Sequence, residues 1–596
     1  MAQQVSDFII DRLSKWGVTR IFGYPGDGIN GVMGALDRAE GKLEFVQVRH
    51  EEVASLMACA HAKYTGEVGV CLATSGPGAI HLLNGLYDAK LDHQPVVALI
   101  GQKPRKALGG HAQQEVDLMT LFKDVASEFV QMATDASQVR HLIDRAFRIA
   151  RDQRTVTCVI LPNDVQELDY EEPKHEHGTI HSGIGYLMPR VLPREEDLQK
   201  AAEVLNSGKK VAILVGAGAK GAAQEVIQVA EVLGAGVAKA YLGKAVLPDE
   251  LPFVTGGIGF FGTTASHQMM ENCDTLLMIG SSFPYAEFLP KEGQARGVQI
   301  DLDGRMLSIR YPMEVPLIGD STETLRALLP LLYRKEDRSW REQIEQNIKD
   351  WWRQTEEQAT HPANPVNPKL VFQKFSPLLP DNSILAADSG SSSSWMSQYI
   401  RIREGMKFSV SGTLATMGCA VPYAIAAKFA FPDRLAVAFA GDGAMQMSSN
   451  AELLTIQKYW QQWTDPRLIV LVLNNRDLNF VTWEQRANEG NPKFDASQVL
   501  PDFNFAQYAE SLGLKGIRIE RPDQIDSALQ EALQADRPVV IDVLADPEIV
   551  PFTTQVAAKF GENIASAIQE GDQAAARHLE EPLKEAVEEA QKKTEE

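Results

Sequence analysis

The chain has 596 residues, of which 44% are hydrophobic and 23% are charged, and its formal net charge is −21. At roughly 150 residues per domain, this length predicts three or four domains. The acidic balance argues against a nucleic-acid-binding protein and against electrostatic docking on an anionic membrane, since both need a basic surface.

Short β-branched runs alternate with longer helical patterns along the chain, which is typical of parallel α/β sheets. In chain order, the runs predict strands at 19–23, 68–73, 95–101, 156–161, 211–215, 274–279, 297–301, 383–387, 435–440, 468–473 and 538–543. A polar stretch at 168–197 and a charged, tryptophan-bearing stretch that ends at 361–368 are predicted linkers. We therefore predict three doubly wound parallel-sheet domains and a C-terminal helical tail, at 1–180, 190–335, 365–550 and 551–596.

The N-terminal segment has helical spacing broken by charges, which fits neither a signal peptide nor a membrane span. The five cysteines form no CxxC pair, and most lie in apolar surroundings. These features predict a cytoplasmic protein with buried free thiols.

Two polar motifs follow neighbouring strands of the third region. Strand 435–440 runs into Gly441-Asp442-Gly443, and strand 468–473 runs into Asn474-Asn475. Oxygen ligands of this kind suit Mg²⁺ or Ca²⁺, and Mg²⁺ in proteins often also binds phosphate oxygens. Two ordinary turns are the alternative interpretation, but the paired motifs favour a site for Mg²⁺ and a diphosphate.

The paired motifs resemble the GDG and NN signature of thiamine-diphosphate enzymes in the pyruvate oxidase and acetolactate synthase superfamily. The resemblance implies that Asp442 and the Asn475 side chain bind Mg²⁺, with the backbone carbonyl of Asp477 as a third ligand. More residues separate the two motifs than is usual in the family. We expect the excess, 458–467, to be a surface loop between a helix and a strand.

Two further segments of the third region, 387–395 and 412–427, are similar to cofactor-binding segments of the family. By that resemblance, the first holds the diphosphate. In the second, Met417 supports a bent cofactor and the Ala415 carbonyl accepts a hydrogen bond from the pyrimidine amino group. Met417 alone could equally be core filler. The implied cofactor contacts are Gly390, Ser391, Ser392, Ala415, Met417, Gly441, Gly443 and Ala444.

The first region supplies an acidic residue, Glu51, which follows His50 at the start of an alanine-rich helix. Ala54 stands where a metalloprotease HExxH motif needs histidine. The segment resembles the family's RHE segment, in which the glutamate binds pyrimidine N1′ and shares a proton with it. The alternative is a glutamate that only favours the helix N-terminus.

Three other first-region segments agree with this resemblance. Pro25 and Gly26 lie in a turn similar to the one near the pyrimidine, and 73–86 resembles the family's SGPG loop and helix. Gln114 matches an active-site glutamine. Gln113 and Ser389 replace a usual Phe and Val, which makes the expected substrate pocket more polar than pyruvate alone requires.

The segment 478–486 resembles the pocket segment of pyruvate oxidases, in which Phe480 and Glu484 would contact the substrate and the path to a flavin. Its Trp-Glu pair also resembles a segment of acetolactate synthases, so it does not separate the two branches.

The middle region contains the glycine-rich run 216–221 after a strand, but no acidic residue follows at a clear strand end, which makes an NAD site unconvincing. The region resembles the FAD domain of pyruvate oxidases more closely. Decarboxylases keep the same fold without flavin. The implied FAD contacts are Gly216, Gly218, Gly257, Gly259, Phe260, Ser282, Phe283, Tyr285, Asp301 and Asp320.

These resemblances imply an enzyme that decarboxylates a 2-oxo acid, most simply pyruvate, using thiamine diphosphate, Mg²⁺ and FAD, with electrons passed to the flavin. Carboligation, non-oxidative decarboxylation and a non-catalytic scaffold are the alternatives. The family forms its site between subunits, so a homodimer or homotetramer is expected. An apolar stripe in the tail, Val556 to Ile568, predicts a helix packed on the body or on a neighbouring subunit, with peripheral membrane contact at most.

Overall fold

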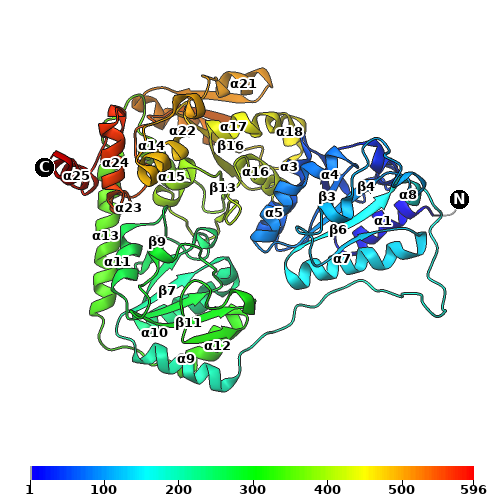
Figure 1. The fold of residues 1–596 in the computed structure, drawn as a ribbon, viewed down its shortest axis with the longest axis horizontal. Coiled ribbons are helices and arrows are strands. Elements are labelled where there is room, and N and C mark those ends of the chain that lie inside the picture. Colours follow the sequence, from blue (N-terminus) through cyan, green and yellow to red (C-terminus); the bar gives the residue numbers. More distant parts are fainter. Residues whose placement is uncertain (1–2, 596) are drawn as a thin grey trace.

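The computed structural model describes residues 3–595, which form three α/β lobes followed by C-terminal helices (Figure 1). Each lobe contains a six-stranded sheet in which every strand pair is parallel. The predicted fold class, three doubly wound sheets with a helical tail, is confirmed.

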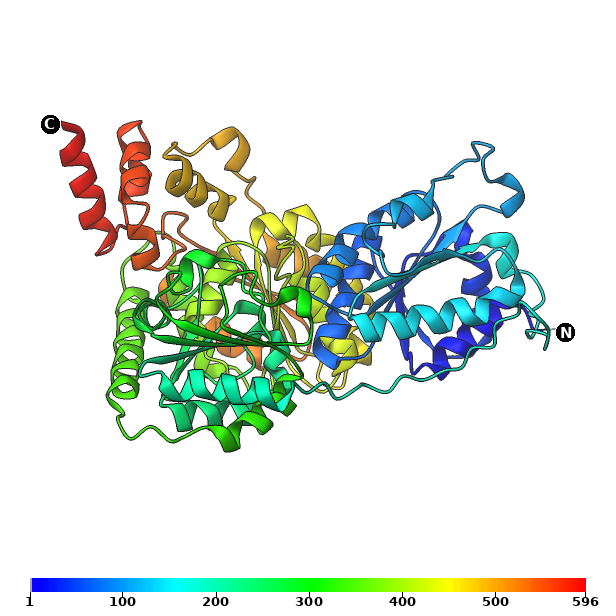
Figure 2. The same ribbon diagram turned by 60° about the horizontal axis from the view of Figure 1, so that its bottom comes forward.

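The first lobe has strand order β2-β1-β3-β4-β6-β5. Its strands are β1 (Arg20–Gly23), β2 (Glu44–Gln47), β3 (Gly69–Ala73), β4 (Val96–Gln102), β5 (Val130–Met132) and β6 (Val156–Pro162). Its longer helices are α1 (Val5–Lys15), α2 (Asn30–Arg38), α3 (Glu51–Thr65), α4 (Pro77–His81), α5 (Leu83–Leu91) and α7 (Val139–Gln153). An extended segment then crosses to the middle lobe, where α9 begins at Glu195 (Figure 2).

The middle lobe has strand order β12-β11-β10-β7-β8-β9. Its strands are β7 (Val211–Val215), β8 (Gly236–Lys239), β9 (Val254–Gly257), β10 (Thr275–Ile279), β11 (Arg296–Asp301) and β12 (Val315–Ile318). Its helices are α9 (Glu195–Ser207), α10 (Ala223–Leu233), α11 (Thr264–Asn272) and α12 (Ser321–Leu328).

Most of the second predicted linker is helical. Residues Ser339–Ala359 form the 21-residue helix α13, which buries Trp340, Ile344, Ile348 and Trp351. The spacing of these four side chains places them on one face of a helix. Apart from the buried Arg341, most of the abundant charges lie on the other faces, and they had masked this pattern.

The third lobe repeats the topology of the first, with strand order β14-β13-β15-β16-β18-β17. Its strands are β13 (Ile384–Ala387), β14 (Lys407–Ser409), β15 (Ala436–Gly441), β16 (Leu468–Asn474), β17 (Lys515–Ile519) and β18 (Val539–Leu544). Its helices include α14 (Pro368–Phe375), α15 (Ser391–Tyr399), α16 (Ala420–Ala430), α17 (Asp442–Met447), α18 (Glu452–Tyr459), α19 (Asn479–Glu484), α21 (Phe505–Ser511) and α22 (Ile525–Leu533).

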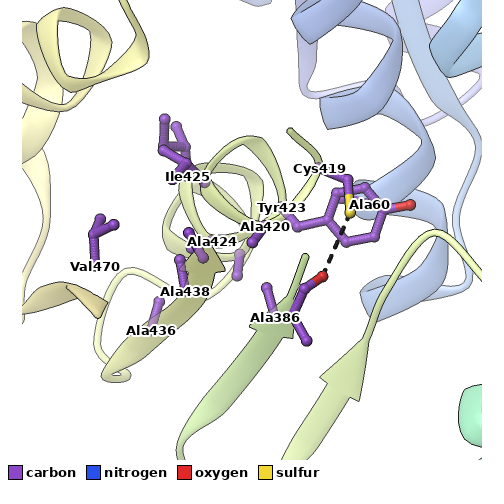
Figure 3. Packing of buried hydrophobic residues seen from close by; sticks show 14 of the residues in the cluster. Ala60, Ala386, Cys419, Ala420, Tyr423, Ala424, Ile425, Ala436, Ala438 and Val470 are labelled. Atoms are coloured by element: carbon purple, nitrogen blue, oxygen red, sulfur yellow. Dashed lines mark hydrogen bonds between the residues drawn. The ribbon is translucent and has the colours of Figure 1, made fainter. Parts of the chain in front are cut away.

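The first and third lobes share one hydrophobic core. Helix α3 of the first lobe packs on α16 of the third, and Figure 3 shows Tyr423 of α16 beside Ala60 of α3. On the other side of α16, Ala386 and Ala438 come from the strands beneath it (Figure 3). This packing fixes the position of the first lobe relative to the third within one chain.

The segment predicted to be a surface loop, 458–467, is partly buried. Tyr459 and Trp463 pack against Phe429 at the end of α16. The Tyr459 hydroxyl also accepts a hydrogen bond of 2.8 Å from the backbone N–H of Gln47 in the first lobe. The surface-loop expectation was therefore wrong for these two aromatic residues, which help to join the lobes.

The C-terminal residues form α23 (Thr554–Ala558), α24 (Gly561–Gln569) and α25 (Leu583–Glu595), packed on the body as predicted. Arg486, which is fully buried, donates to Asp572 of this tail and to Glu548, at 2.8 Å each. All five cysteines are buried and free, as expected. No helix within residues 3–595 has the length and apolarity needed to span a membrane.

Candidate active site

The predicted metal ligands meet at the carboxyl edge of the third sheet, where β15 and β16 lie side by side. Asp442 begins α17, and its carboxylate accepts backbone N–H donors from Gly443 at 2.9 Å and from Arg476 at 2.5 Å. The second bond ties the loop after β16 to Asp442. The two motifs that were paired in the sequence are therefore adjacent in the structure.

Asp442 is a buried carboxylate without a cationic partner. It is 2% exposed, and burial raises its pKa from 3.8 to about 7. No lysine, arginine or histidine forms an ion pair with it among residues 3–595. A buried carboxylate in this state favours a bound cation. The donor set therefore fits the predicted Mg²⁺.

The loop after β16 holds the other two predicted ligands. The Asn475 side-chain oxygen accepts from the backbone N–H of Asp477 at 3.1 Å. The Asp477 carboxylate pairs with Lys493 at 2.9 Å, so that side chain is already neutralised. Arg476 between them has a left-handed backbone, with φ of 56°. This arrangement agrees with a role for the Asp477 carbonyl rather than its carboxylate.

The predicted diphosphate cradle is the N-terminus of the nine-residue helix α15. Gly390 precedes it with φ of 123°, and a Cβ at Gly390 would meet nothing within 4 Å. Ser391 and Ser392 are buried in the first turn, and the buried Ser394 hydroxyl has no hydrogen-bond partner among residues 3–595. A helix N-terminus with open space and an unused hydroxyl fits an anionic group.

Asp388, which the sequence analysis did not assign, organises this cradle. It is fully buried, and its carboxylate accepts backbone N–H bonds from Ser389 at 2.9 Å and Gly418 at 2.7 Å. Burial raises its pKa to about 7. Asp388 thereby links the cradle to the 411–418 loop that carries Ala415 and Met417.

The 411–418 loop is held from the first lobe. Asp92 accepts the N–H groups of Gly412 and Thr413 at 2.8 Å each, and the buried Lys63 donates to Asp92 at 2.7 Å and to the Val410 carbonyl at 2.7 Å. Ala415 is exposed and has φ of 56°, an uncommon conformation for a residue with a Cβ. The strained residue is the one whose carbonyl was predicted to bind the cofactor.

Met417 and the glycines of the GDG motif come together. A Cβ at Gly443 would lie 3.3 Å from the Met417 Cε, whereas a Cβ at Gly441 would meet nothing within 4 Å. Ala444 is buried in α17. Met417 is half-buried, so core filling does not fully account for it.

Glu51 begins α3, as predicted, and is 8% exposed. One of its carboxylate oxygens lies 2.9 Å from Nδ1 of His81, at the end of α4. The other approaches Gly78, where a Cβ would lie 3.2 Å from it. Sequence reasoning missed His81, although the histidine lies inside the SGPG segment, 73–86.

Gln114 lies over the same SGPG loop. A Cβ at Gly76 would be 2.8 Å from the Gln114 Cβ, and Gln114 is exposed with φ of 64°. The turn of Pro25 and Gly26 also lies close to the end of β3, since a Cβ at Gly26 would lie 2.5 Å from Thr74. The structure therefore brings the predicted first-lobe residues together.

Contacts between the lobes run close to Glu51. Asn84 donates to Glu52 at 2.6 Å and to the Thr416 hydroxyl of the third lobe at 2.9 Å. The buried Glu452 accepts the Arg49 backbone N–H at 3.0 Å. Glu51 thus lies between two hydrogen-bonded contacts that join the first and third lobes.

Glu452 gives the protein a pH-dependent stability. Burial raises its pKa from 4.5 to about 7, so the folded state holds a proton that the unfolded state releases. The free energy of unfolding therefore falls as pH rises from about 4.5 to about 7. Glu452→Gln should remove this loss. The unfolding free energy of the variant minus that of the parent should therefore be larger at pH 8 than at pH 4.5, by up to about 3 kcal/mol.

Denaturant unfolding at both pH values checks this prediction, with the exposed Glu510→Gln as the matched control. If the two variants respond to pH alike, the Glu452 carboxyl does not titrate as expected.

The predicted flavin segments of the middle lobe form part of an aromatic cluster. Phe260 lies 5.1 Å from both Tyr285 and Phe288, measured between ring centroids, and 6.3 Å from Phe552. A Cβ at Gly259 would lie 3.1 Å from Phe283. Gly257 and Ser282 lie at the carboxyl ends of β9 and β10.

Close packing of the backbone explains the glycines in the turn 216–221. The N–H of Gly218 donates to the Gly280 carbonyl at 3.0 Å, and a Cβ at Gly218 would lie 2.8 Å from the Gly280 Cα. At the end of β8, the fully buried Lys239 pairs with Asp249 at 2.6 Å. A lysine there agrees with the argument against NAD.

The two acidic residues among the implied FAD contacts, Asp301 and Asp320, already have partners. Asp301 accepts from the Asp303 N–H at 2.9 Å, and Asp320 accepts from the Glu323 N–H at 3.0 Å as the N-cap of α12. Each carboxylate keeps further lone pairs.

The predicted pocket segment 478–486 reaches this aromatic cluster. The Phe480 ring lies 5.5 Å from Phe261 of the middle lobe and 5.3 Å from Phe552. Glu484 is exposed on α19. The segment that was predicted to face the substrate therefore adjoins the segment that was predicted to face the flavin.

Comparisons with known proteins agree with the three-lobe arrangement. The family descriptions that match are the N-terminal TPP binding domain (3–121), central domain (198–328) and C-terminal TPP binding domain (388–543) of thiamine pyrophosphate enzymes. YdaP of Bacillus subtilis, which is named as a thiamine pyrophosphate-containing protein, is 37% identical over 536 residues, 90% of each chain.

Two other relatives represent different branches. The acetolactate synthase isozyme 3 large subunit of Escherichia coli is 30% identical over 91% of this chain and 94% of its own. The pyruvate oxidase of Lactiplantibacillus plantarum is 28% identical over 90% of this chain and 87% of its own. With both TPP binding domains and the central domain matched, the chain belongs to the thiamine pyrophosphate enzyme family.

Proposed function

We propose that this enzyme oxidatively decarboxylates a 2-oxo acid, most simply pyruvate, on thiamine diphosphate and transfers the electrons to FAD. The observation that carries the proposal is the contact between Phe480 and Phe261, whose ring centroids are 5.5 Å apart. It supports the proposal because Phe480 belongs to the segment expected to face the substrate, and Phe261 adjoins the implied FAD contact Phe260. Short separation between the substrate and the flavin is what electron transfer requires.

The chain's own residues would bind the cofactor at both ends. Asp442, the Asn475 side chain and the Asp477 carbonyl would hold Mg²⁺, and the N-terminus of α15 would hold the diphosphate. Glu51 would hold the pyrimidine end and exchange a proton with it. Bound thiamine diphosphate supplies a carbon nucleophile and an electron sink for decarboxylation.

Gln114 and Glu484 are exposed polar side chains beside this site, and they would orient the 2-oxo acid. Gln113 and Ser389 add polar groups, which supports a substrate as polar as pyruvate or more polar. The glycine-rich loops of the middle lobe would bind FAD.

The proposed assembly is a homodimer or homotetramer, with each cofactor held between Glu51 of one subunit and Asp442 of another. Its support is the resemblance to a family that forms its site between subunits, together with the location of Glu51 and Asp442 in different lobes. Sedimentation with activity measured across the fractions tests this. A catalytically active monomer would contradict the proposed assembly.

The proposed reaction predicts a spectral change. Anaerobic addition of pyruvate to the purified protein with thiamine diphosphate and Mg²⁺ should bleach the visible absorbance of bound flavin, because the flavin accepts the electrons. Omission of thiamine diphosphate is the control. Flavin that stays oxidised while pyruvate is consumed would contradict an oxidase.

Carboligation is the second candidate, and the similarity to an acetolactate synthase large subunit over 91% of this chain supports it. A carboligase would form acetolactate from pyruvate without any change in flavin absorbance. Product analysis of the same anaerobic mixture separates the two reactions.

A further inference from the structure

Two histidines lie beside Glu51 at the start of α3. His81 Nδ1 is 2.9 Å from a Glu51 carboxylate oxygen, and the His50 and His81 rings are stacked with centroids 4.3 Å apart. One potential ligand atom from each of the three residues lies within 4.8 Å of the others. Within residues 3–595, this is the one such group of three or more His, Cys, Asp or Glu side chains.

Two imidazoles and one carboxylate are the donor set that Zn²⁺ takes in many proteins, with a further position left for water. The His50 and His81 side chains are 45% and 42% exposed, which leaves both rings room to turn toward a shared ion. The Glu51 side chain alone is 11% exposed and less free to move, so it would provide the fixed ligand.

We propose that His50, Glu51 and His81 form a binding site for a divalent transition-metal ion, with Zn²⁺ the best match, in the cofactor-free enzyme. The inference extends to inhibition, and this part rests on the proposed role of Glu51 in binding the pyrimidine. A Glu51 carboxylate that is bound to a metal ion cannot also hold the pyrimidine nitrogen. Zn²⁺ and thiamine diphosphate therefore exclude each other at Glu51.

The site differs from the Mg²⁺ site at Asp442. The ligands at Asp442 are all oxygens, which suit Mg²⁺, whereas imidazole nitrogens favour zinc and its neighbours among the transition metals. The histidines of the first linker are a weaker alternative. His175 and His181 are both exposed, and their ring centroids are 5.6 Å apart.

Calorimetric titration of the cofactor-free, full-length protein with Zn²⁺ tests the site. Binding should weaken by at least about 10-fold in His81→Gln and in His50→Asn, in which asparagine keeps the helix cap. His177→Gln, an exposed histidine of the linker, is the control and should bind as the parent does. Unchanged binding in both site variants, or weakened binding in the control alone, overturns the proposal.

Competition is measured through cofactor binding rather than turnover. Quenching of tryptophan fluorescence reports thiamine diphosphate binding at saturating Mg²⁺, with and without Zn²⁺. Zn²⁺ should weaken cofactor binding in the parent by about the factor 1 + [Zn²⁺]/Kd, and far less in His81→Gln. An equal effect in both proteins would indicate that Zn²⁺ acts at the Mg²⁺ site. The proposed competition at Glu51 would then be wrong.

The two experiments separate the metal site from the proposed function. If Zn²⁺ binds and depends on His81 but leaves cofactor affinity unchanged, the metal site stands and the role of Glu51 fails. If no Zn²⁺ binds while Glu51→Gln still abolishes turnover, the metal site fails and the role of Glu51 stands.

Discussion

Replacing Glu51 with glutamine should lower kcat by about 10²- to 10⁴-fold, the usual contribution of a positioned acid or base. The amide keeps the length of the side chain and one acceptor for the contact with His81, which is 2.9 Å in the parent. It cannot exchange a proton with the cofactor. The free energy of unfolding should change by no more than about 1.5 kcal/mol, the scale of one hydrogen bond.

Steady-state turnover of the 2-oxo acid, with denaturant unfolding measured beside it, checks this prediction. Glu67→Gln is the matched control, because Glu67 is exposed just beyond the other end of α3. Full activity in Glu51→Gln would mean that Glu51 takes no part in the chemistry. It would then favour the interpretation of the protein as a non-catalytic scaffold.

Replacing Asp442 with asparagine should weaken Mg²⁺-dependent binding of thiamine diphosphate by about 2–5 kcal/mol, the cost of truncating one member of a buried charge pair. That cost corresponds to roughly 30-fold to several thousand-fold in Kd. The cofactor-free protein should lose much less stability. Burial already disfavours the ionised carboxylate, as its pKa of about 7 shows, so its loss removes an unfavourable charge.

Equilibrium binding at several Mg²⁺ concentrations measures this effect. Asp495→Asn, an exposed carboxylate of the same lobe, should bind the cofactor as the parent does. Cofactor affinity that keeps its Mg²⁺ dependence in Asp442→Asn would place the metal ligand elsewhere.

Most inner strands of the sheets could be predicted from the sequence, and the edge strands could not. Strands such as β4 and β16 are seven-residue apolar runs, buried on both faces. β2, β5, β14 and β17 lie at sheet edges, where a strand is short or half-exposed. These four were missed, together with β8, β9 and β12 of the middle lobe.

The residues of the candidate site also divide into those that could be predicted from the sequence and those that could not. Asp442 and Asn475 were found because each directly follows a predictable strand. The carboxylates of Asp388 and Asp92 were not assigned, because their partners are backbone N–H groups of a loop distant in sequence. His81 was missed because its partner is the Glu51 carboxylate, 30 residues earlier in the chain. A sequence motif indicates which residues belong to a candidate site, whereas only the folded chain shows which of them are in contact.

The identical strand order of the first and third lobes gives corresponding positions different tasks. The turn after β3 carries the SGPG loop beneath Glu51, and the equivalent turn after β15 carries Asp442. The helices that pack the lobes together, α3 and α16, are also equivalent, since each precedes the third strand of its lobe. Two lobes with one topology thus carry different chemical groups: the first carries Glu51 and the histidines beside it, and the third carries the proposed metal ligands.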